Sequence, residues 1–595
     1  MLKKLTAKIR YIFQYKSKNI DRAMFYLSLL FMFFVINHIG NVFGHQYQDT
    51  FEDATVWIFY GLFVLTLLIT SGELLFTKIN ISHYTGIFVV GYFLLITIAR
   101  LTHIPFLEFL TKETWLQLGI AIVFISQLSK NSLFFDKLYF NPTILFVISF
   151  LVIILIGTFL LMVPRATYTA PLGFIDAFFM ATSAVCITGL GVVDVATDFS
   201  LFGKTVVMIL MQAGGLGIMT FTGFFGYFFS GGFSFKNQLM YGEILSENKL
   251  TSVISTLLKI IFITLLFEFV GGVFIYFSLD DQLFSGREEK LFFTTFHTIS
   301  AFCNAGFSTI HGGLGNESFR FNYPFQIVLT CMFILGGLGF NTIYNFYTFI
   351  KSKIKGFIYT FILHKKYIHK AQLFTFNTKF VIVCNIIVII LATVSFYFLE
   401  GQHALTEDQG VVNKISASFF TANNARSTGF GSVDVNFIGG PTLILFISLM
   451  WMGSSPGSTG GGVKVTTVAI ALLNVVFLAR GKKDMEIFKR RIADETKNKA
   501  FAIIVLSFLV ITISFVLLNF SDSDQPMKEL LFESISAYST SGLSMGITAN
   551  LSSIGKMIII FTMFVGRVGM LTLLVAFIKN TKNKSYTYPT EKILF

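Results

Sequence analysis

A glycine-containing turn recurs four times along this chain, and no other feature restricts the fold as strongly. The turns align without gaps and read SAVCITGL (183–190), SAFCNAGF (300–307), NNARSTGF (423–430) and SAYSTSGL (536–543). Their glycines lie 117, 123 and 113 residues apart. A sequence that repeats itself at one spacing predicts several copies of one structural unit, here four modules of similar size.

Long apolar stretches flank each turn, and the composition of the chain is typical of a membrane protein. Of the 595 residues 54% are hydrophobic and only 13% are charged, against roughly 45–50% and about 25% in soluble proteins. The mean hydropathy is +0.72. This composition excludes an ordinary cytosolic enzyme and a disordered scaffold. Because the ten-residue alternation of a transmembrane β-barrel is absent from the sequence, we predict an all-α polytopic membrane protein.

The segment before each turn is too short to cross a bilayer. Segments such as 175–186 and 530–539 have about a dozen residues, whereas a helical span needs about 20. We therefore expect each segment to enter the membrane and return, between two full crossings. Since two is an even number, all four turns enter from one face, and the four helix–pore-loop–helix repeats are parallel around a central pore.

Four more apolar stretches precede the modules, near residues 23–44, 54–72, 83–100 and 112–129. They predict an N-terminal four-helix extension. The expected division is an N-terminal basic segment with about four membrane spans (1–138), pore repeat 1 (139–250), pore repeat 2 (251–370), pore repeat 3 with a broken second helix (371–495) and pore repeat 4 (496–595).

Basic residues gather in the connections between modules. The net charge is +13, and residues 351–379 contain seven lysines and no acid. By the positive-inside rule these connections are cytoplasmic, as are the N- and C-termini, so the turns open outward. The sequence thus predicts a multi-pass protein of the cell membrane. The basic residues are explained by this topology, so no nucleic-acid partner is predicted.

Non-helical backbone at membrane depth is tolerated only where protein buries it or where it lines a watery cavity. Glycine permits backbone angles that let consecutive carbonyl oxygens point inward, and four such strands can replace the hydration shell of a monovalent cation. One such turn alone would indicate a tight loop with a helix-ending glycine. Four turns in register favour an ion filter.

The turns, above all RSTGF at 426–430, resemble the filter loops of the Trk/Ktr/HKT superfamily of potassium transporters, as do residues 454–464 and GRVG at 566–569. The resemblance covers roughly residues 139–595 and implies a TrkH/KtrB-like membrane subunit. It also implies that Gly189, where relatives that favour sodium have Ser, indicates potassium. Carried over onto this chain, the carbonyl-bearing filter residues are Ile187, Thr188, Gly189, Asn304, Ala305, Gly306, Ser427, Thr428, Gly429, Thr540, Ser541 and Gly542.

The third module contains a second feature, because residues 440–480 have about twice the length of a simple span. Their middle reads GSSPGSTGGG (453–462), and proline and glycine must break a helix there. A plain kink is one interpretation. The resemblance implies instead a mobile intramembrane loop that gates the pore, with the gate residues Gly457, Ser458, Thr459, Gly460, Gly461, Lys464 and Arg567.

Charged side chains at membrane depth are functional hypotheses by default. Lys464 and Arg567 are either paired or snorkelling charges, or a positive barrier below the filter. Arg426 is expected to be structural. Asp194 and Asp434 either enrich cations at the outer mouth or cap turns. His297 and Glu533 share one register, nine residues before a turn glycine, and are expected to position the pore helices.

The predicted function is potassium uptake across the cell membrane, which the resemblance implies is the bacterial inner membrane. The ion crosses through a filter of backbone carbonyls, and the predicted metal is a K⁺ ion at those carbonyls. The chain is not expected to be an enzyme or to hold a covalent cofactor, since no catalytic cluster or phosphate loop is found in the sequence. Na⁺- or H⁺-coupled symport stays open, as does a non-transporting membrane scaffold. The resemblance implies a homodimer in the lipid bilayer with cytoplasmic nucleotide-binding regulatory subunits of the TrkA/KtrA kind.

Overall fold

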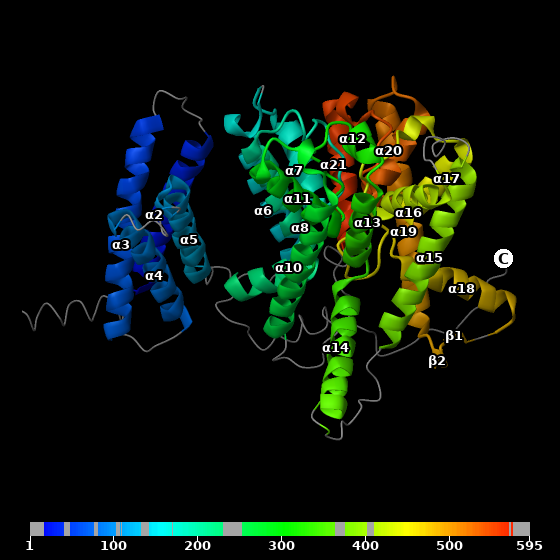
Figure 1. Cartoon of the computed structure of the whole chain (residues 1–595), viewed down its shortest axis with the longest axis horizontal. Helices are drawn as coiled ribbons and strands as arrows, with labels where there is room; N and C mark the ends of the chain where they lie inside the picture. Colours follow the sequence, from blue (N-terminus) through cyan, green and yellow to red (C-terminus); the bar gives the residue numbers. More distant parts are fainter. Residues whose placement is uncertain are drawn as a thin grey trace, which may run out of the picture.

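The computed structural model describes residues 17–40, 48–76, 81–102, 108, 110–131, 142–168, 170–229, 253–362, 364, 375–401, 410–482, 484–570 and 573–574. Within these ranges nearly all secondary structure is helical (Figure 1). The described strands are β1 (Glu486–Ile487) and β2 (Arg490–Arg491), which form one antiparallel hairpin. The predicted all-α architecture is confirmed.

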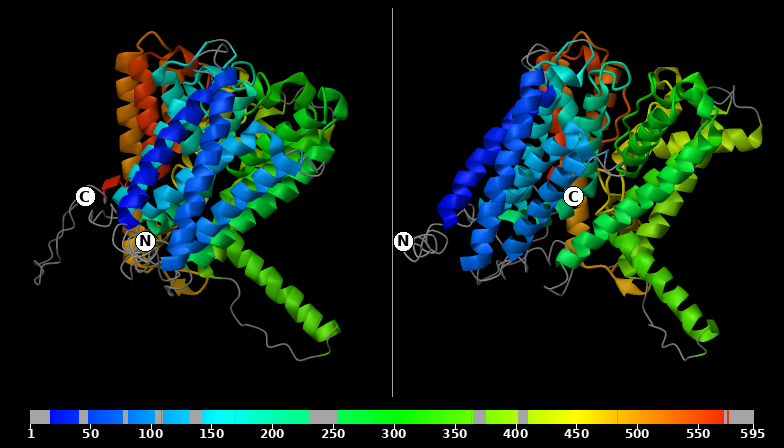
Figure 2. Two further views of the ribbon diagram at one scale, coloured as in Figure 1. Left: turned by 90° about the vertical axis from the view of Figure 1, so that its left-hand side faces the viewer. Right: turned by 60° about the vertical axis from the view of Figure 1, so that its left-hand side comes forward.

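The N-terminal extension folds as four helices, α2 (Ser17–Gly40), α3 (Gln48–Phe76), α4 (Ile81–Thr102) and α5 (Glu113–Asn131), at the left of Figure 1. They bury a core of their own, which includes Phe59, Phe93 and Leu116. The bundle lies against the rest of the molecule, because α5 contacts α8 (Leu201–Phe229) and α2 contacts the short helix η4 (Pro164–Ala166) (Figure 2).

Each of the next four units contains a long helix, a short helix that ends at one of the turns, and a further helix. Unit 1 has α6 (Pro142–Leu161), α7 (Phe174–Cys186) and α8. Unit 2 has α10 (Val253–Ser278), α11 (Arg287–Phe302), the single turn α12 (Glu317–Arg320), α13 (Tyr323–Gly337) and α14 (Phe340–Phe357). Unit 3 has α15 (Phe376–Glu400), α16 (Val411–Ser427), α17 (Gly440–Trp451) and α18 (Val465–Ala479), and unit 4 has α19 (Asp494–Ser521), α20 (Met527–Ser539) and α21 (Ser553–Val568).

The predicted domain boundaries stay predictions. Those near 138, 250 and 370 lie outside the described residues, and the one at 495/496 falls in the first turn of α19.

The four units contact one another in cyclic order. Helix α8 of unit 1 contacts α10 and α11 of unit 2, and α13 of unit 2 contacts α16 of unit 3. Helix α17 of unit 3 contacts α20 of unit 4, and α21 of unit 4 contacts α7 of unit 1. The chain therefore closes a ring on itself.

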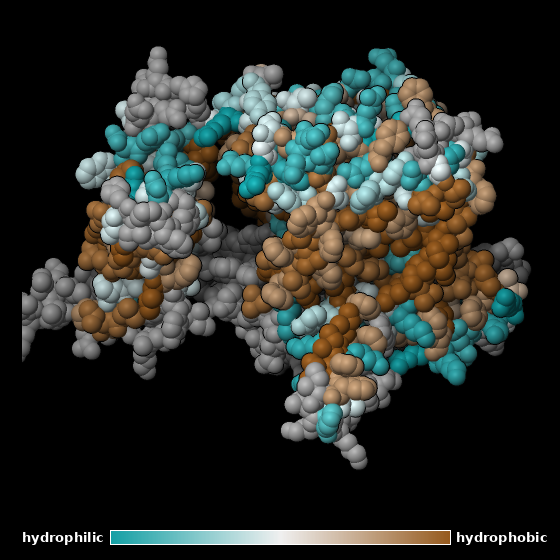
Figure 3. All heavy atoms as spheres, viewed as in Figure 1, coloured by the Kyte–Doolittle hydropathy of each residue, from teal (hydrophilic) through white to brown (hydrophobic). Residues whose placement is uncertain are grey.

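On the face shown in Figure 3, a broad apolar band lies between two more polar ends. Six of the described helices are long and apolar enough to cross a membrane, or seven if the bent pair α13–α14 is one span. Large apolar side chains such as Phe277, Phe398 and Phe520 point out of these helices and are mostly exposed. A soluble protein would bury such residues, so lipid is the solvent for this band.

Among the described elements, two apolar segments are interrupted helices. The predicted break in unit 3 separates α17 from α18, and residues 452–464 between them are non-helical. The second break, between α13 and α14 at Leu338 and Gly339, bends the pair by 102° and was not predicted. Beyond this bend, α14 projects away from the remaining helices (Figures 1 and 2).

Candidate ion filter and gate

The four turns share a backbone conformation around their glycines. Gly189, Gly306, Gly429 and Gly542 all have positive φ, between 69° and 88°. In units 1, 2 and 4 the residue two positions earlier, just beyond the short helix, also has positive φ; these residues are Ile187, Asn304 and Thr540. Unit 3 differs, because α16 includes the equivalent Ser427 and Thr428 is still in the right-handed region. Since L-residues disfavour positive φ, the surrounding structure must hold three of the turns in place.

Each turn glycine touches the backbone of the next turn in the ring. A Cβ added at Gly189 would lie 2.5 Å from the carbonyl oxygen of Ala305, and a Cβ at Gly306 would collide with that of Thr428. A Cβ at Gly429 would likewise collide with the carbonyl oxygen of Ser541, and one at Gly542 with that of Thr188. The contacts run from unit 1 through units 2, 3 and 4 and back to unit 1, so the four turns surround one axis.

The carbonyl oxygens of the twelve predicted filter residues have no hydrogen-bond donor among the described residues. Ten of these residues are buried, and Gly189 and Gly542 are half-buried. Buried backbone carbonyls are almost always paired. A ring of buried carbonyls that lacks protein donors suits a ligand that itself supplies positive charge.

Side chains from the short helices hold the turns from behind. His297 lies with Nδ1 2.9 Å from the Phe293 carbonyl and Nε2 3.0 Å from the Ser308 hydroxyl. In unit 4, Glu533 accepts a hydrogen bond from the Thr548 hydroxyl. In unit 3 the amide of Asn424 donates to the Phe430 carbonyl and accepts from the Phe430 N–H. These contacts agree with the expected positioning role of His297 and Glu533.

Asp194 and Asp434 both act as turn caps. Oδ1 of Asp194 accepts from the N–H of Ala196, and Oδ1 of Asp434 accepts from the N–H of Asn436. Asp194 also pairs with His311 of unit 2, with 2.6 Å between Oδ2 and Nδ1.

The non-helical segment 452–464 of unit 3, here called the intramembrane loop, is bonded to two other units. The N–H groups of Ser455 and Thr459 donate to the carbonyls of Gly337 and Gly336, at the end of α13. The carbonyl of Gly457 accepts from the N–H of Phe340, the first residue of α14.

On the side of the loop that faces turn 4, the Gly461 N–H donates to the hydroxyl of the predicted filter residue Thr540 (3.0 Å). The loop thus lies directly against turn 4 and fills the bend between α13 and α14.

Arg567 and Lys464 both donate to backbone carbonyls around this loop. Nη1 of Arg567 donates to the Thr459 carbonyl, and Nη2 donates to the Gly214 carbonyl of α8 at 2.7 Å. Nζ of Lys464 donates to the carbonyls of Gly460 and Gly461, at 2.6 and 3.3 Å. Neither cation pairs with a carboxylate in the described part of the chain. The structure therefore brings all the predicted gate residues except Gly457 and Ser458 into one bonded cluster, and those two lie on the same loop.

A cavity of about 260 Å³ lies beside the loop, lined by Gly457, Ser458, Lys464, Gly566 and Arg567 among others. Both cations border it, so the cavity is a positively charged space next to the loop.

Asn385 is a structural residue that the sequence analysis missed. Its Oδ1 accepts from Nη2 of Arg426 and its Nδ2 donates to the Ser455 hydroxyl, both at 2.8 Å. Nε of Arg426 donates to the Gly453 carbonyl at 3.1 Å, in agreement with the structural role expected for Arg426. An asparagine inside the apolar run of α15 was the available signal, because a buried amide needs partners.

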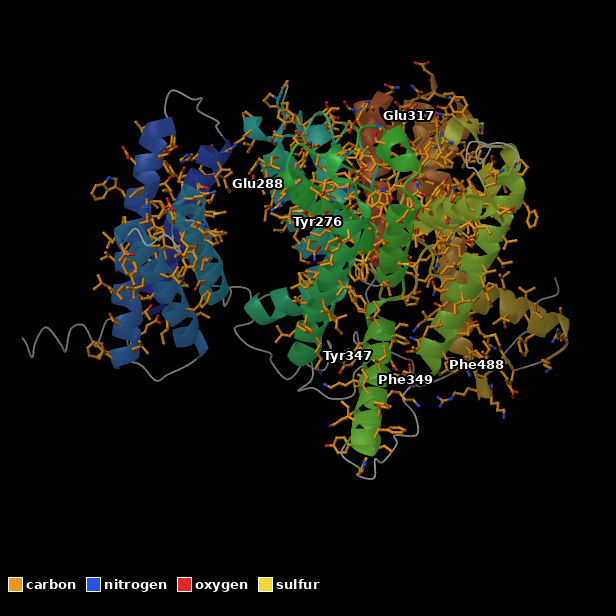
Figure 4. All side chains as sticks on the ribbon, viewed as in Figure 1. Tyr276, Glu288, Glu317, Tyr347, Phe349 and Phe488 are labelled. Atoms are coloured by element: carbon orange, nitrogen blue, oxygen red, sulfur yellow. The ribbon has the colours of Figure 1, made fainter. Side chains whose placement is uncertain are left out.

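The two ends of the molecule differ in charge. Glu288 and Glu317 lie at the end where the turns open, whereas Tyr347, Phe349 and Phe488 lie toward the opposite end (Figure 4). Lysines 351, 353 and 379 lie over these three rings.

At the acidic end, Lys290 donates to Asp281 and lies 4.4 Å from the ring centre of Tyr276. The hydrogen bond from Lys290 holds the pKa of the Asp281 carboxyl below its usual value.

Short helices that end at four turns around one axis, inside a belt of lipid-facing helices, define the class of polytopic pore-loop membrane proteins. A family model described as "TrkH: Cation transport protein" matches residues 119–588. The chain belongs to this family.

The chain is also similar to curated proteins that are named as potassium uptake proteins. The chain is 34% identical over 456 residues to "Ktr system potassium uptake protein B" of Bacillus subtilis (strain 168), which covers 76% of this chain and 96% of the relative. It is 35% identical over 439 residues to the protein of the same name in Vibrio alginolyticus, covering 74% and 91%. The crystal structure of the potassium transporter TrkH from Vibrio parahaemolyticus has the same fold, with a TM-score of 0.58 at 15% identity, covering 84% of this chain and 97% of that one.

Proposed function

We propose that this chain is the membrane subunit of a potassium uptake system and that K⁺ crosses the cell membrane through the ring of filter carbonyls. The single observation that carries the proposal is the cyclic contact of the four turn glycines with the next turn's carbonyl. The proposal is supported by the twelve carbonyls that lack a donor in the described part of the chain, and by the relatives that are named potassium uptake proteins. Carbonyl dipoles attract cations and replace their hydration shell, so an anion is excluded as cargo.

The intramembrane loop is the proposed gate. It contacts filter residue Thr540 on one side and Arg567 on the other, so it occupies the path directly beyond the filter. The fixed charges of Arg567 and Lys464 raise the energy of a cation on that path. Movement of the loop would open the path, and its glycines give it the backbone freedom to move.

The proposed setting is the cell membrane, with the basic end and both termini in the cytoplasm. A homodimer with cytoplasmic nucleotide-binding regulatory subunits fits relatives whose names place them in a "Ktr system". The basic residues around α14 and the β1–β2 hairpin would then face those subunits.

The Gly189→Ser variant tests the filter. Among the four glycines, Gly189 has the widest space toward the next carbonyl, so a small side chain there should distort one carbonyl pair and leave the fold intact. We expect the variant still to take up rubidium, the tracer for potassium. Inhibition of this uptake by sodium should increase about tenfold, which corresponds to a loss of ~1.4 kcal/mol in the discrimination against sodium. An unchanged preference in a well-expressed variant would remove turn 1 from the filter.

Uptake into proteoliposomes also separates the remaining alternatives. Flux that follows an imposed sodium or proton gradient would indicate a coupled symporter, and flux that depends on the potassium gradient alone would indicate gated permeation. A scaffold would transport nothing.

A further inference from the structure

Three metal-binding side chains meet in the N-terminal bundle, on three different helices. His38 lies in the last turn of α2, Glu52 near the start of α3 and Glu113 in the first turn of α5. One ligand atom from each lies within 4.8 Å of the other two. All three residues precede residue 119, where the family match begins, so they lie outside the part of the chain that the family model describes.

The hydrogen bonds around His38 orient its ring. The Thr55 hydroxyl donates to the Phe51 carbonyl at 2.8 Å, so its oxygen is left as an acceptor for Nδ1 of His38, 3.2 Å away. Nδ1 therefore carries the proton, and Nε2 faces Oε1 of Glu113 at 3.4 Å. In metal sites, the histidine ligand usually donates one ring N–H to a neighbouring protein group and binds the metal through its other nitrogen. Thr55 and Nε2 of His38 match this arrangement.

The distances suit a small divalent ion. Metal–ligand bonds of about 2.0–2.1 Å give a tetrahedron with edges of about 3.3 Å, and the His38–Glu113 separation of 3.4 Å already matches one edge. His38 is buried, Glu113 is partly exposed and Glu52 is exposed. Glu52 can therefore swing in from solvent, and the fourth position is open to water. One imidazole with two carboxylates favours a first-row transition metal over Mg²⁺ or Ca²⁺, which prefer oxygen ligands alone.

We propose that His38, Glu52 and Glu113 form a binding site for a divalent transition metal ion of the Zn²⁺ class. The site joins the ends of α2, α3 and α5. It also adjoins the pore units, because Nη1 of Arg165 in η4 donates to the Ile39 carbonyl and Gly40 packs on Val163. Metal binding would fix the end of the bundle next to the segment that leads into α7.

The test uses the full-length protein, purified without a polyhistidine tag and stripped with chelator. Zinc bound after gel filtration is measured by mass spectrometry, and Co²⁺ is added as a spectroscopic probe. We expect one zinc per chain, a visible Co²⁺ spectrum of tetrahedral type and no competition from excess Mg²⁺. Glu52→Gln and Glu113→Gln should each weaken zinc binding at least about tenfold, the lower end of what second-sphere changes cause.

Glu108→Gln is the matched control, because Glu108 is an exposed carboxylate next to the same bundle and outside the cluster. It should bind zinc as the parent protein does. Glu52 is exposed, so its variant remains informative even if Glu113→Gln folds poorly. Absence of stoichiometric zinc in the parent protein, or unchanged binding in Glu52→Gln, would overturn the proposal and leave a His38–Glu113 ion pair.

Discussion

At the scale of single residues, glycine is required in the turns for two separable reasons. The positive φ of each turn glycine disfavours any side chain, at a cost of roughly 1–2 kcal/mol. The carbonyl of the next turn then occupies the space that a Cβ would need. Only the second reason concerns the contact between neighbouring turns, and therefore the proposed filter.

A pair of variants separates these reasons. Gly429 and Gly546 both have positive φ, 74° and 94°, but a Cβ at Gly429 meets the Ser541 carbonyl whereas a Cβ at Gly546 meets nothing within 4 Å. We expect Gly429→Ala to reduce rubidium uptake on the order of a hundredfold, the result of about 2.7 kcal/mol of disrupted packing. Gly546→Ala should keep most of the uptake. Equal loss in both variants would show that backbone conformation alone matters.

At the scale of elements, the intramembrane loop and Arg567 act together. The two ends of the guanidinium bond the Thr459 and Gly214 carbonyls, so Arg567 ties the loop to α8. Arg567→Gln removes both the positive charge and the two-pronged guanidinium group. Arg567→Lys keeps the charge but can no longer bridge the two carbonyls in the same way.

We expect Arg567→Gln, which removes the positive charge and the bonds to both carbonyls, to raise the rubidium flux on the order of tenfold, a change of ~1.4 kcal/mol. Arg567→Lys should raise the flux less, and neither variant should change the potassium-to-sodium preference. Flux in liposomes, normalised to the amount of protein, measures both. A change in selectivity at constant rate would contradict the role as a gate.

Elements also show how far sequence reasoning reaches. The break between α17 and α18 was predictable, because Pro456 and its neighbouring glycines cannot continue a helix. The break after α13 was not, since GGLG occurs twice and behaves differently: residues 214–217 lie inside α8, whereas residues 336–339 end α13. The two GGLG segments differ in their tertiary contacts, because the second one meets the intramembrane loop. There Gly339 packs on the Pro456 carbonyl, and the N–H of Phe340 donates to the Gly457 carbonyl.

The same limit applies to the site. Register alone identified the four turn glycines, and the structure places them in one ring. The sequence register could not reveal that Ser427 is helical while its counterparts have positive φ. Nor could it reveal that the Asn304 side-chain amide lies 2.8 Å from the Ser427 hydroxyl, a contact between two turns that are 123 residues apart.

At the scale of the whole molecule, the ring must close between its last and first units. Nζ of Lys556 in α21 lies 2.7 Å from Oδ1 of Asp176 in α7, and the two side chains are 14% and 36% exposed. The pair joins residues 380 positions apart. Among the residues that the structure describes, this ion pair connects unit 4 to unit 1.

We expect Lys556→Met to lower the free energy of unfolding by about 1 kcal/mol or less, given the partial exposure of the pair. A double-mutant cycle with Asp176→Asn, measured by denaturation in detergent, isolates the coupling. Lys499→Met is the control, because Lys499 pairs with Glu495 inside one helix, with both side chains exposed. Its effect should be near zero, and an equal effect in the two variants would contradict a role in closing the ring.

The contact of each turn glycine with the following turn has a consequence for how this protein can change. In a channel built from four identical chains, one mutation alters every wall of the pore at once. Here one polypeptide supplies all four walls, so a mutation alters a single quadrant and is felt first by one neighbour. A mutation can therefore change one quadrant of the ring of turns while the other three keep their own residues. The quadrants already differ, because Ser427 is helical in the third turn whereas its counterparts in the other turns have positive φ.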